Sequence, residues 1–355
     1  MELTFIGTGA ADFGLLDDPD AVAEHVRAAR WMGGRNRRRP ASVVVTSTAA
    51  ESASAGPGGG VTDAVGAVGA ESTSAGPTLA ATDAAGEDAV TSAEAEVTSM
   101  VKAILIDHHD GAGLAACGLH ARDIGALLVT HGHWDHLQPR AVLELASQRP
   151  DPLPVFGNAS VCASLRLAAN HTWDAASNRL VTRPERMNDS HRMPVHCREL
   201  VPGQSVEVGG TTVTALAANH QIDTQRLLME QQALIYLLRA NSGTLLYALD
   251  SSYLLPETLQ ALSGVYLDAV VLDGTFGEME IDPATSGHHN FRMLDQTVAE
   301  LRAAGCVDEH TTVFASHISL AYVPPHDVIG ERLRRRGVVL AHDGMVWTRR
   351  RGQSR

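Results

Sequence analysis

The sequence predicts an α/β fold, in which sheets are covered by helices. Its expected strands are continuous apolar blocks, and helix-compatible segments lie between several of them. Continuous apolar strands are typical of sheets that are buried on both faces. The chain has 355 residues, 44% of them hydrophobic, so it can bury a sizeable core.

The N-terminal part is expected to begin with a strand at residues 3–6, followed by a Gly-Thr-Gly turn at residues 7–9. Residues 20–30 are compatible with a helix, and the basic segment 35–40 is expected to be a loop. Residues 42–46 are rich in β-branched side chains, which favour a second strand.

After this strand, residues 47–99 differ sharply in composition from the rest of the chain. They are mostly Ala, Gly, Ser, Thr and acids, with eight acidic residues and no Lys or Arg. The heptapeptide that starts at Glu51 also returns, with one change, at Glu71. Neither copy has the apolar positions that a stacked repeat needs. We therefore expect one domain over residues 1–355, interrupted at 47–99 by a disordered insertion between two adjacent strands.

Beyond the insertion, apolar blocks and helix-compatible segments continue to the C-terminus. Strands are expected at residues 101–106, 126–130, 155–156, 212–216, 233–239, 244–249, 269–272 and 312–315. Helices are expected at residues 139–147, 290–304 and 326–336.

Composition argues against several classes of protein. The formal net charge is −13, and it is still −5 without the insertion, so the chain lacks the basic balance of a general nucleic-acid binder. The cysteines form no CxxC pair, and neither a disulfide framework nor a Cys-rich zinc site is expected; they are Cys117, Cys162, Cys197 and Cys306. No apolar run approaches ~18 residues, and the N-terminus lacks a signal-peptide pattern, so we expect a cytoplasmic protein without a membrane span.

A dense cluster of metal-ligand residues follows the apolar strand at 126–130. His131, His133 and Asp135 are spaced two residues apart, so extended geometry places them on one side. His136 is adjacent to Asp135 and can turn toward a second centre. Imidazole and carboxylate ligands suit zinc or a similar first-row ion, so the segment can serve two metals about 3.5–4 Å apart.

This HxHxDH pattern resembles the signature of the metallo-β-lactamase superfamily. The resemblance implies an αββα sandwich of two mixed sheets flanked by helices, and three further ligands in a fixed order. Each of these follows an expected strand here: His220, Asp250 and His317. The resemblance also implies how two metals are shared. One takes His131, His133 and His220, the other takes Asp135, His136 and His317, and Asp250 bridges them.

Within the superfamily, the ligand set resembles that of phosphodiesterases, ribonuclease Z and thiolester hydrolases. True zinc β-lactamases carry Cys where Asp250 stands. Short motifs at both ends of the chain are similar to the cyclic-phosphate phosphodiesterase of the carbon–phosphorus lyase pathway; they lie at residues 4–10, 38–44, 219–220, 316–319 and 342–345. That relative has a Cys-rich structural zinc site near its N-terminus, whereas residues 11–35 here contain no cysteine.

Two adjacent histidines are candidates for a proton donor. His288 and His289 precede an expected helix, where related enzymes carry a His that protonates the leaving group. The spacing favours His288 over His289, although both stay open as catalytic residues beside Asp135. The resemblance also implies that Asp107, at a strand end, orients the metal loop by contacting its ligands.

The resemblance implies a metal-dependent hydrolase that cleaves a small, cyclic phosphodiester with a hydroxide held by two divalent ions, in the first place zinc, with manganese or iron as alternatives. The alternatives are hydrolysis of a thiolester, lactone or carboxylic ester, and a non-hydrolytic accessory role like that of pyrroloquinoline-quinone-pathway relatives. The expected partner is a small molecule rather than a nucleic acid or a membrane, and a homodimer is compatible with the sequence. The acidic balance disfavours ribonuclease Z.

Overall fold

A computed structural model describes residues 1–10, 34–36, 38–47, 103–183, 193–220 and 232–349 of the chain. The expected helix at 20–30 lies outside these residues, as does nearly all of the expected insertion at 47–99.

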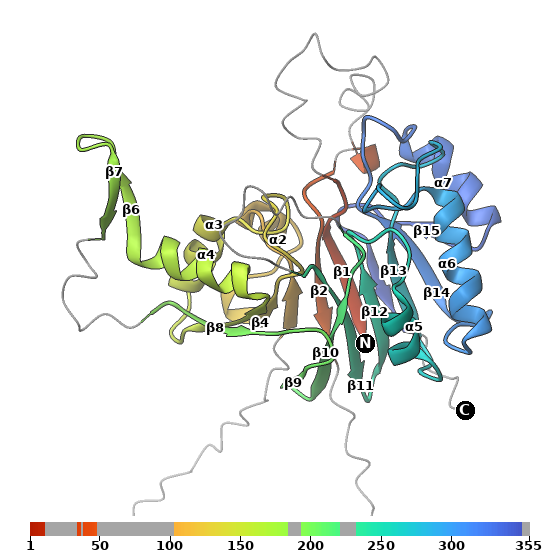
Figure 1. The fold of residues 1–355 in the computed structure, drawn as a ribbon, viewed down its shortest axis with the longest axis horizontal. Helices are drawn as coiled ribbons and strands as arrows, with labels where there is room; N and C mark the ends of the chain where they lie inside the picture. Colours follow the sequence, from red (N-terminus) through yellow and green to blue (C-terminus); the bar gives the residue numbers. More distant parts are fainter. Residues whose placement is uncertain (11–33, 37, 48–102, 184–192, 221–231, 350–355) are drawn as a thin grey trace, which may run out of the picture. The chain divides into compact units, whose positions relative to one another are not determined.

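Two mixed seven-stranded sheets form the centre of the fold (Figure 1). The first has the strand order β16 (Val346–Thr348), β1 (Glu2–Gly7), β2 (Ser42–Thr46), β3 (Ala103–Ile106), β4 (Ile124–Leu128), β5 (Leu153–Gly157) and β8 (Val195–Glu199). The second has the order β15 (Val338–Leu340), β14 (Thr312–Ser316), β13 (Ala269–Asp273), β12 (Gly243–Ala248), β11 (Leu234–Ala240), β10 (Thr211–Ala217) and β9 (Ser205–Val208). Strands β6 (His171–Asp174) and β7 (Arg179–Thr182) form a separate hairpin.

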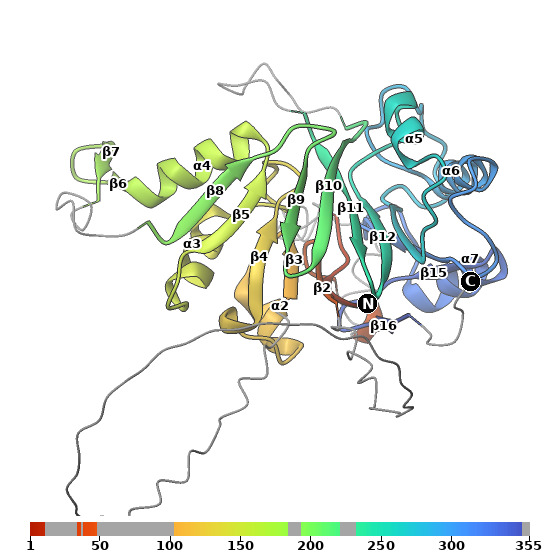
Figure 2. The same cartoon turned by 90° about the horizontal axis from the view of Figure 1, so that it is seen from below.

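Helices cover the outer face of each sheet (Figure 2). The first sheet carries α2 (Gly111–Ala116), α3 (Pro139–Ser147) and α4 (Ala159–Asn170), and the second carries α5 (Pro256–Leu262), α6 (Phe291–Ala303) and α7 (His326–Arg335). Two short 3-10 helices, η2 (Gly34–Asn36) and η3 (Ala121–Asp123), lie in connections. The predicted αββα sandwich of two mixed sheets is therefore confirmed.

Three apolar clusters separate these layers, one under each set of helices and one between the sheets. In the central cluster Phe5 of the first sheet meets Phe314 of the second, with ring centroids 5.2 Å apart. Tyr236 is fully buried there, and its hydroxyl donates a hydrogen bond to the Val129 carbonyl at 2.7 Å. Each such side chain contributes about 1.5–3 kcal/mol by leaving water, which explains why the strands are apolar on both faces.

The strands on either side of the expected insertion are direct neighbours. Strand β2 pairs antiparallel with β3, and Val43 lies opposite Ile106. The chain therefore leaves the first sheet after β2 and returns to the adjacent position.

The Gly-Thr-Gly turn after β1 is required by a close backbone approach. A Cβ atom on Gly7 would lie 1.9 Å from the carbonyl oxygen of Pro40, so any other residue would push the two segments apart. The turn leads directly to the edge at which the polar cluster described below is found.

The expectation of no disulfide is wrong in one place. Cys162 of α4 and Cys197 of β8 are joined by a disulfide, although 35 residues separate them in the sequence. The pairing arises because α4 packs against the end of the first sheet that β8 closes, a contact that cysteine spacing does not reveal. None of the helices within the described ranges is long and apolar enough to cross a membrane.

Candidate metal centre

The strand ends gather the polar residues of the fold at one edge. Strands β3 and β4 run parallel in the first sheet, and β12, β13 and β14 run parallel in the second. Strand β10 runs in the same direction as β12, because both are antiparallel to β11. Residues that follow these strands therefore meet at the carboxyl edges of the two sheets, where α/β folds commonly place their sites.

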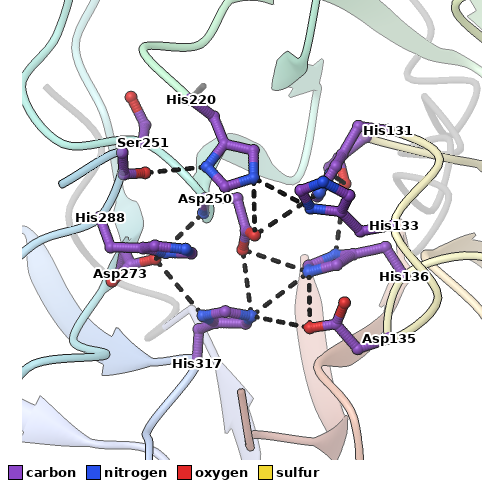
Figure 3. Close-up of polar contacts among 12 residues, drawn as sticks. His131, His133, Asp135, His136, His220, Asp250, Ser251, Asp273, His288 and His317 are labelled. Atoms are coloured by element: carbon purple, nitrogen blue, oxygen red, sulfur yellow. Dashed lines mark hydrogen bonds and ion pairs between the residues drawn. The ribbon is translucent and has the colours of Figure 1, made fainter. Parts of the chain in front are cut away.

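All seven predicted metal ligands lie together at this edge (Figure 3). One group of possible ligand atoms comes from His131, His133, His220 and Asp250, and another from Asp135, His136 and His317. A third, overlapping combination joins Asp250 and His317 to Asp273 and His288. Six of the seven are supplied by loops that follow β4, β12 and β14, and His220 follows β10. Each group lies within 4.8 Å across its own ligand atoms, which suits a single ion.

Asp250 lies between the two groups and presents one oxygen to each. Its Oδ1 is 3.2 Å from His136 Nε2 and 3.1 Å from His317 Nε2. Its Oδ2 is 3.5 Å from His220 Nε2 and 3.6 Å from His131 Nε2. A carboxylate with one oxygen toward each group could contribute a ligand atom to either of them.

Contacts within each group are equally short. His220 Nε2 lies 3.1 Å from His133 Nδ1 in the first group. In the second, Asp135 Oδ2 lies 3.3 Å from His317 Nε2 and 3.4 Å from His136 Nε2. The nitrogen and oxygen atoms converge on common points, as ligands around an ion do.

Backbone strain is concentrated in the same place. Four non-glycine residues have positive φ within the described part of the chain, and three of them follow strands at this edge: Asp107 (57°), Asp250 (49°) and His317 (57°). Each such conformation costs of order 1–3 kcal/mol and persists where the surroundings enforce it, which is typical of functional sites.

Two buried carboxylates contact Nδ1 atoms of the imidazoles in the cluster. Asp107 Oδ2 accepts a hydrogen bond from His136 Nδ1 at 2.9 Å, as the sequence led us to expect of this residue. Asp273, which ends β13, lies with Oδ2 2.8 Å from His288 Nδ1 and 3.4 Å from His317 Nδ1. Such partners fix the tautomer and the orientation of a metal-binding imidazole.

Asp273 and Thr275 were missed by sequence reasoning. Thr275 Oγ1 lies 2.7 Å from His317 Nδ1, and the Thr275 backbone N–H donates to Asp273 Oδ1 at 2.9 Å. One signal was available, because Asp273 ends an apolar strand just as Asp107 and Asp250 follow theirs. Thr275 had no comparable signal.

The adjacent histidines His288 and His289 lie in different environments. The His288 ring stacks on His317, with centroids 5.3 Å apart and planes 8° apart, and packs edge-on against His220. His289 is buried and its Nε2 lies 3.0 Å from Thr297 Oγ1 on α6. Only His288 of the pair therefore lies at the polar cluster, and Asp135 lies within it as a possible ligand.

Burial and charge set the protonation states of the histidines. Burial lowers the pKa of His131 well below its usual value and that of His220 to about 4. Burial also acts on His136 and His317, but the carboxylates around them more than offset it and raise the pKa of His136 well above the usual range and that of His317 to about 10. The imidazoles of the first group are therefore neutral. Those of His136 and His317 in the second group carry protons, which a bound cation would displace.

The carboxylates of the cluster are ionised. Burial by itself would raise the pKa of Asp250, yet His136 and His317 hold it well below the usual value. The same balance keeps the pKa of Asp135 low, with His136 as the main opposing charge. Ionised oxygens beside neutral imidazole nitrogens are the states in which both bind metal ions.

Unsatisfied buried atoms provide a direct test of whether a metal fits here. His131 Nε2 and Asp250 Oδ1 are buried and form no hydrogen bond among the described residues, although Asp250 Oδ1 lies at ion-pair distance from His136 and His317. Buried polar atoms without partners are costly, and a coordinated cation would satisfy both. The mixture of imidazole and carboxylate donors matches first-row divalent ions such as zinc.

The motifs from the two ends of the chain support the loop of His317. The buried Arg38 donates from Nη1 to Thr8 Oγ1 at 2.7 Å, and Thr8 Oγ1 donates to Asp343 Oδ1 at 2.8 Å. The Thr8 carbonyl then accepts the backbone N–H of Ile318 at 2.9 Å. This network ties both termini of the described chain to the residue after a candidate ligand.

We predict that Asp107→Ala weakens metal binding by about 10–100-fold, because His136 loses the partner that orients it. The buried N–H and hydroxyl of Thr130, which donate to Asp107 at 2.8 and 3.0 Å, also lose their acceptor. Breaking such a buried pair should lower the free energy of unfolding by roughly 3–5 kcal/mol. Chelator competition and urea unfolding measure the two effects.

Asp110→Ala is the matched control, because Asp110 caps α2 three residues away with no contact to the histidines described above. It should cost about 1 kcal/mol and leave metal affinity unchanged. Equal metal affinity in the Asp107 variant and the parent protein would contradict the supporting role.

Comparison with known proteins gives one sequence match and several structural ones. Residues 114–318 match the family described as a beta-lactamase superfamily domain. No curated protein sequence matches the chain significantly.

Three solved structures resemble the chain over nearly its whole length. The metallo-beta-lactamase fold protein YhfI from Bacillus subtilis is 15% identical with a TM-score of 0.55, covering 98% of both chains. The short form of human tRNase Z is 15% identical with a TM-score of 0.55, covering 99% of this chain and 100% of its own. Zn²⁺-bound PqqB from Methylobacterium extorquens is 13% identical with a TM-score of 0.54, covering 98% and 99%. At these identities the likeness shows a shared fold.

Proposed function

The chain belongs to the beta-lactamase superfamily, and from this premise we propose that it is a metal-dependent hydrolase of small phosphodiesters. The observation that carries the proposal is the position of Asp250, with one oxygen toward each of two groups of nitrogen and oxygen ligands. In this proposal His131, His133 and His220 hold one divalent ion, and Asp135, His136 and His317 hold another. Zinc is the first candidate, with manganese and iron as alternatives.

When bound, such a pair of ions supplies a water of lowered pKa, near ~7, and positive charge that stabilises a phosphoryl group under attack. Asp250 holds the two halves of the site together. Asp107 and Asp273 keep His136 and His317 turned inward.

His288 is the group that can hold the proton for the leaving oxygen. Its Nδ1 faces Asp273 at 2.8 Å, which leaves Nε2 to carry a proton toward the substrate. The side chain retains 19% of its exposure, so a substrate can reach it. Burial lowers the pKa of His288, but Asp273 and Asp250 reverse this and raise it above its usual value.

The presence of a proton donor bears on the substrate class. An alkoxide is a poor leaving group and needs a proton, whereas a thiolate leaves readily without one. The arrangement of His288 and Asp273 therefore favours an oxygen ester over a thiolester. The similarity of the motifs at both ends of the chain to the cyclic-phosphate phosphodiesterases favours phosphorus over carbon as the centre attacked.

The test is a parallel assay of the full chain after loading with zinc, manganese or iron. We expect turnover of bis(p-nitrophenyl) phosphate and of ribose cyclic phosphates, loss of turnover with a chelator, and recovery on adding metal. Lactones, carboxylic esters and thiolesters form the comparison panel. Turnover restricted to that panel would replace the phosphodiester proposal, and no turnover of any ester would favour a non-hydrolytic role.

A further inference from the structure

Exposed aromatic side chains are concentrated in the loops that supply the candidate ligands. Three aromatic residues are strongly exposed within the described ranges: Trp134 (41%), Tyr253 (41%) and Tyr322 (43%). Trp134 lies between two candidate ligands, and the tyrosines follow Asp250 and His317 within five residues. Aromatic residues make up only 4% of the chain, so an exposed aromatic side chain that is also joined to the polar cluster by ring contacts is a candidate binding surface.

One of these residues is connected to the polar cluster by a continuous series of ring contacts. His288 stacks on His317 at 5.3 Å, and Phe276 packs edge-on against His288 at 5.9 Å. Tyr322 then packs against Phe276 at 5.4 Å with planes 36° apart. We call Phe276 and Tyr322 the aromatic wall; it begins at the proposed proton donor and ends in solvent.

The aromatic wall is held in place by its backbone. The Phe276 N–H donates to the His289 carbonyl at 3.0 Å, and the Phe276 carbonyl accepts the Met279 N–H at 2.9 Å. The loop after Tyr322 returns to the core through the buried Val323. A rigid surface of this kind can bind a flat group with little loss of conformational entropy.

Within the described residues, no Lys or Arg side chain is paired with the carboxylates of the site. Four ionisable carboxylates lie in or under the cluster, and within the described residues no Lys or Arg forms a hydrogen bond or ion pair with any of them; they are Asp107, Asp135, Asp250 and Asp273. An anionic group beside the aromatic wall, away from the proposed ions, would normally be paired with such a cation. An uncharged ring, by contrast, stacks on an aromatic surface without one.

We propose that the aromatic wall stacks against a flat, uncharged aromatic ring in the leaving group, so that the substrate is a phosphodiester bearing an aryl or heterocyclic ring. The proposal rests on the proposed function for the reaction, and on the ring contacts for the group bound. The wall adjoins His288, which places it on the leaving-group side of the reacting bond. Stacking of one ring on an aromatic side chain is worth about fivefold to a hundredfold in affinity.

Binding of two phosphonates to the zinc-loaded full chain tests this without any bond being broken. Benzylphosphonate and methylphosphonate present the same anion to the metals and differ in the ring. We expect benzylphosphonate to bind at least about fivefold more tightly by calorimetry, and Tyr322→Ala to remove most of that ratio. Tyr322→Phe should preserve it, because the ring remains.

Tyr253→Ala is the matched control, since it removes an equally exposed tyrosine from another ligand loop, and it should leave the ratio unchanged. The proposal that the aromatic wall binds a ring would be rejected by any of three results. These are equal affinities for the two phosphonates, no measurable binding of either, and the same loss in both alanine variants. The protein could also prefer benzylphosphonate through Tyr322 and yet turn over no phosphodiester. That result would support ring binding by the aromatic wall and reject the proposed reaction.

Discussion

Asp250→Ala is expected to reduce kcat/KM for phosphodiesters by at least about a thousandfold and to lower the bound metal from two ions to one or fewer. The reason is that Asp250 places one carboxylate oxygen within 3.6 Å of imidazole Nε2 atoms in each ligand group. Ions in such a site supply several kcal/mol of charge stabilisation, and each 1.4 kcal/mol is a factor of ten in rate. Metal analysis and steady-state kinetics on the same preparation measure both effects.

Asp268→Ala is the matched control for this variant. Asp268 is also a hydrogen-bonded carboxylate beside the second sheet, where it accepts the Thr244 N–H at 2.8 Å at the start of β12. It should affect stability but leave metal content and turnover unchanged. If the Asp250 variant kept two ions and full activity, a dinuclear site bridged by Asp250 would be ruled out.

His288→Gln is expected to reduce kcat by about 10²–10⁴-fold for substrates with alkoxide leaving groups, with metal content unchanged. The loss should be much smaller for p-nitrophenolate esters, whose leaving group needs no proton. A merely structural defect would affect both kinds of substrate equally. Asp273→Asn should show the same dependence on leaving group at smaller amplitude, because it misorients His288 rather than removing it, and it should also weaken metal binding through His317, which Asp273 contacts.

His289→Gln tests whether the proposed proton donor is His288 and not the adjacent His289. His289 contacts Thr297 on α6, so its loss should lower the melting temperature and leave the kcat of the folded enzyme nearly unchanged. Release of metal from the His288 variant, or equal losses with both leaving groups, would contradict the assignment of His288 as proton donor.

Much of the fold could be predicted from the sequence, because core strands and helices carry their own signal. The strand at Ser42–Thr46 and the helix at Pro139–Ser147 have the predicted bounds, and most other central strands agree to within two residues. Each is an apolar block or an amphipathic segment whose pattern is local. Helix α4 was missed although it buries Val161 and Leu165 on one face, whereas several short or edge strands that were missed lack such a pattern. Strand β8, for example, is an edge strand with mostly exposed side chains.

The same distinction between local sequence pattern and tertiary packing applies to the polar site. The sequence by itself determined the superfamily, the αββα class and the seven ligand candidates, because these depend on residue types at fixed spacing and on strands that end in His or Asp. Only the tertiary structure decided how those residues are used. It placed the two oxygens of Asp250 toward different groups, separated His288 from His289, and brought Asp273 under both His288 and His317.

The same holds for the Cys162–Cys197 disulfide and for the aromatic wall, whose residues come from separate loops. The physical reason is that a contact between side chains depends on the packing of distant strands and on the direction in which each side chain leaves the backbone. The spacing of residues along the chain reveals neither the packing of distant strands nor the direction of the side chains.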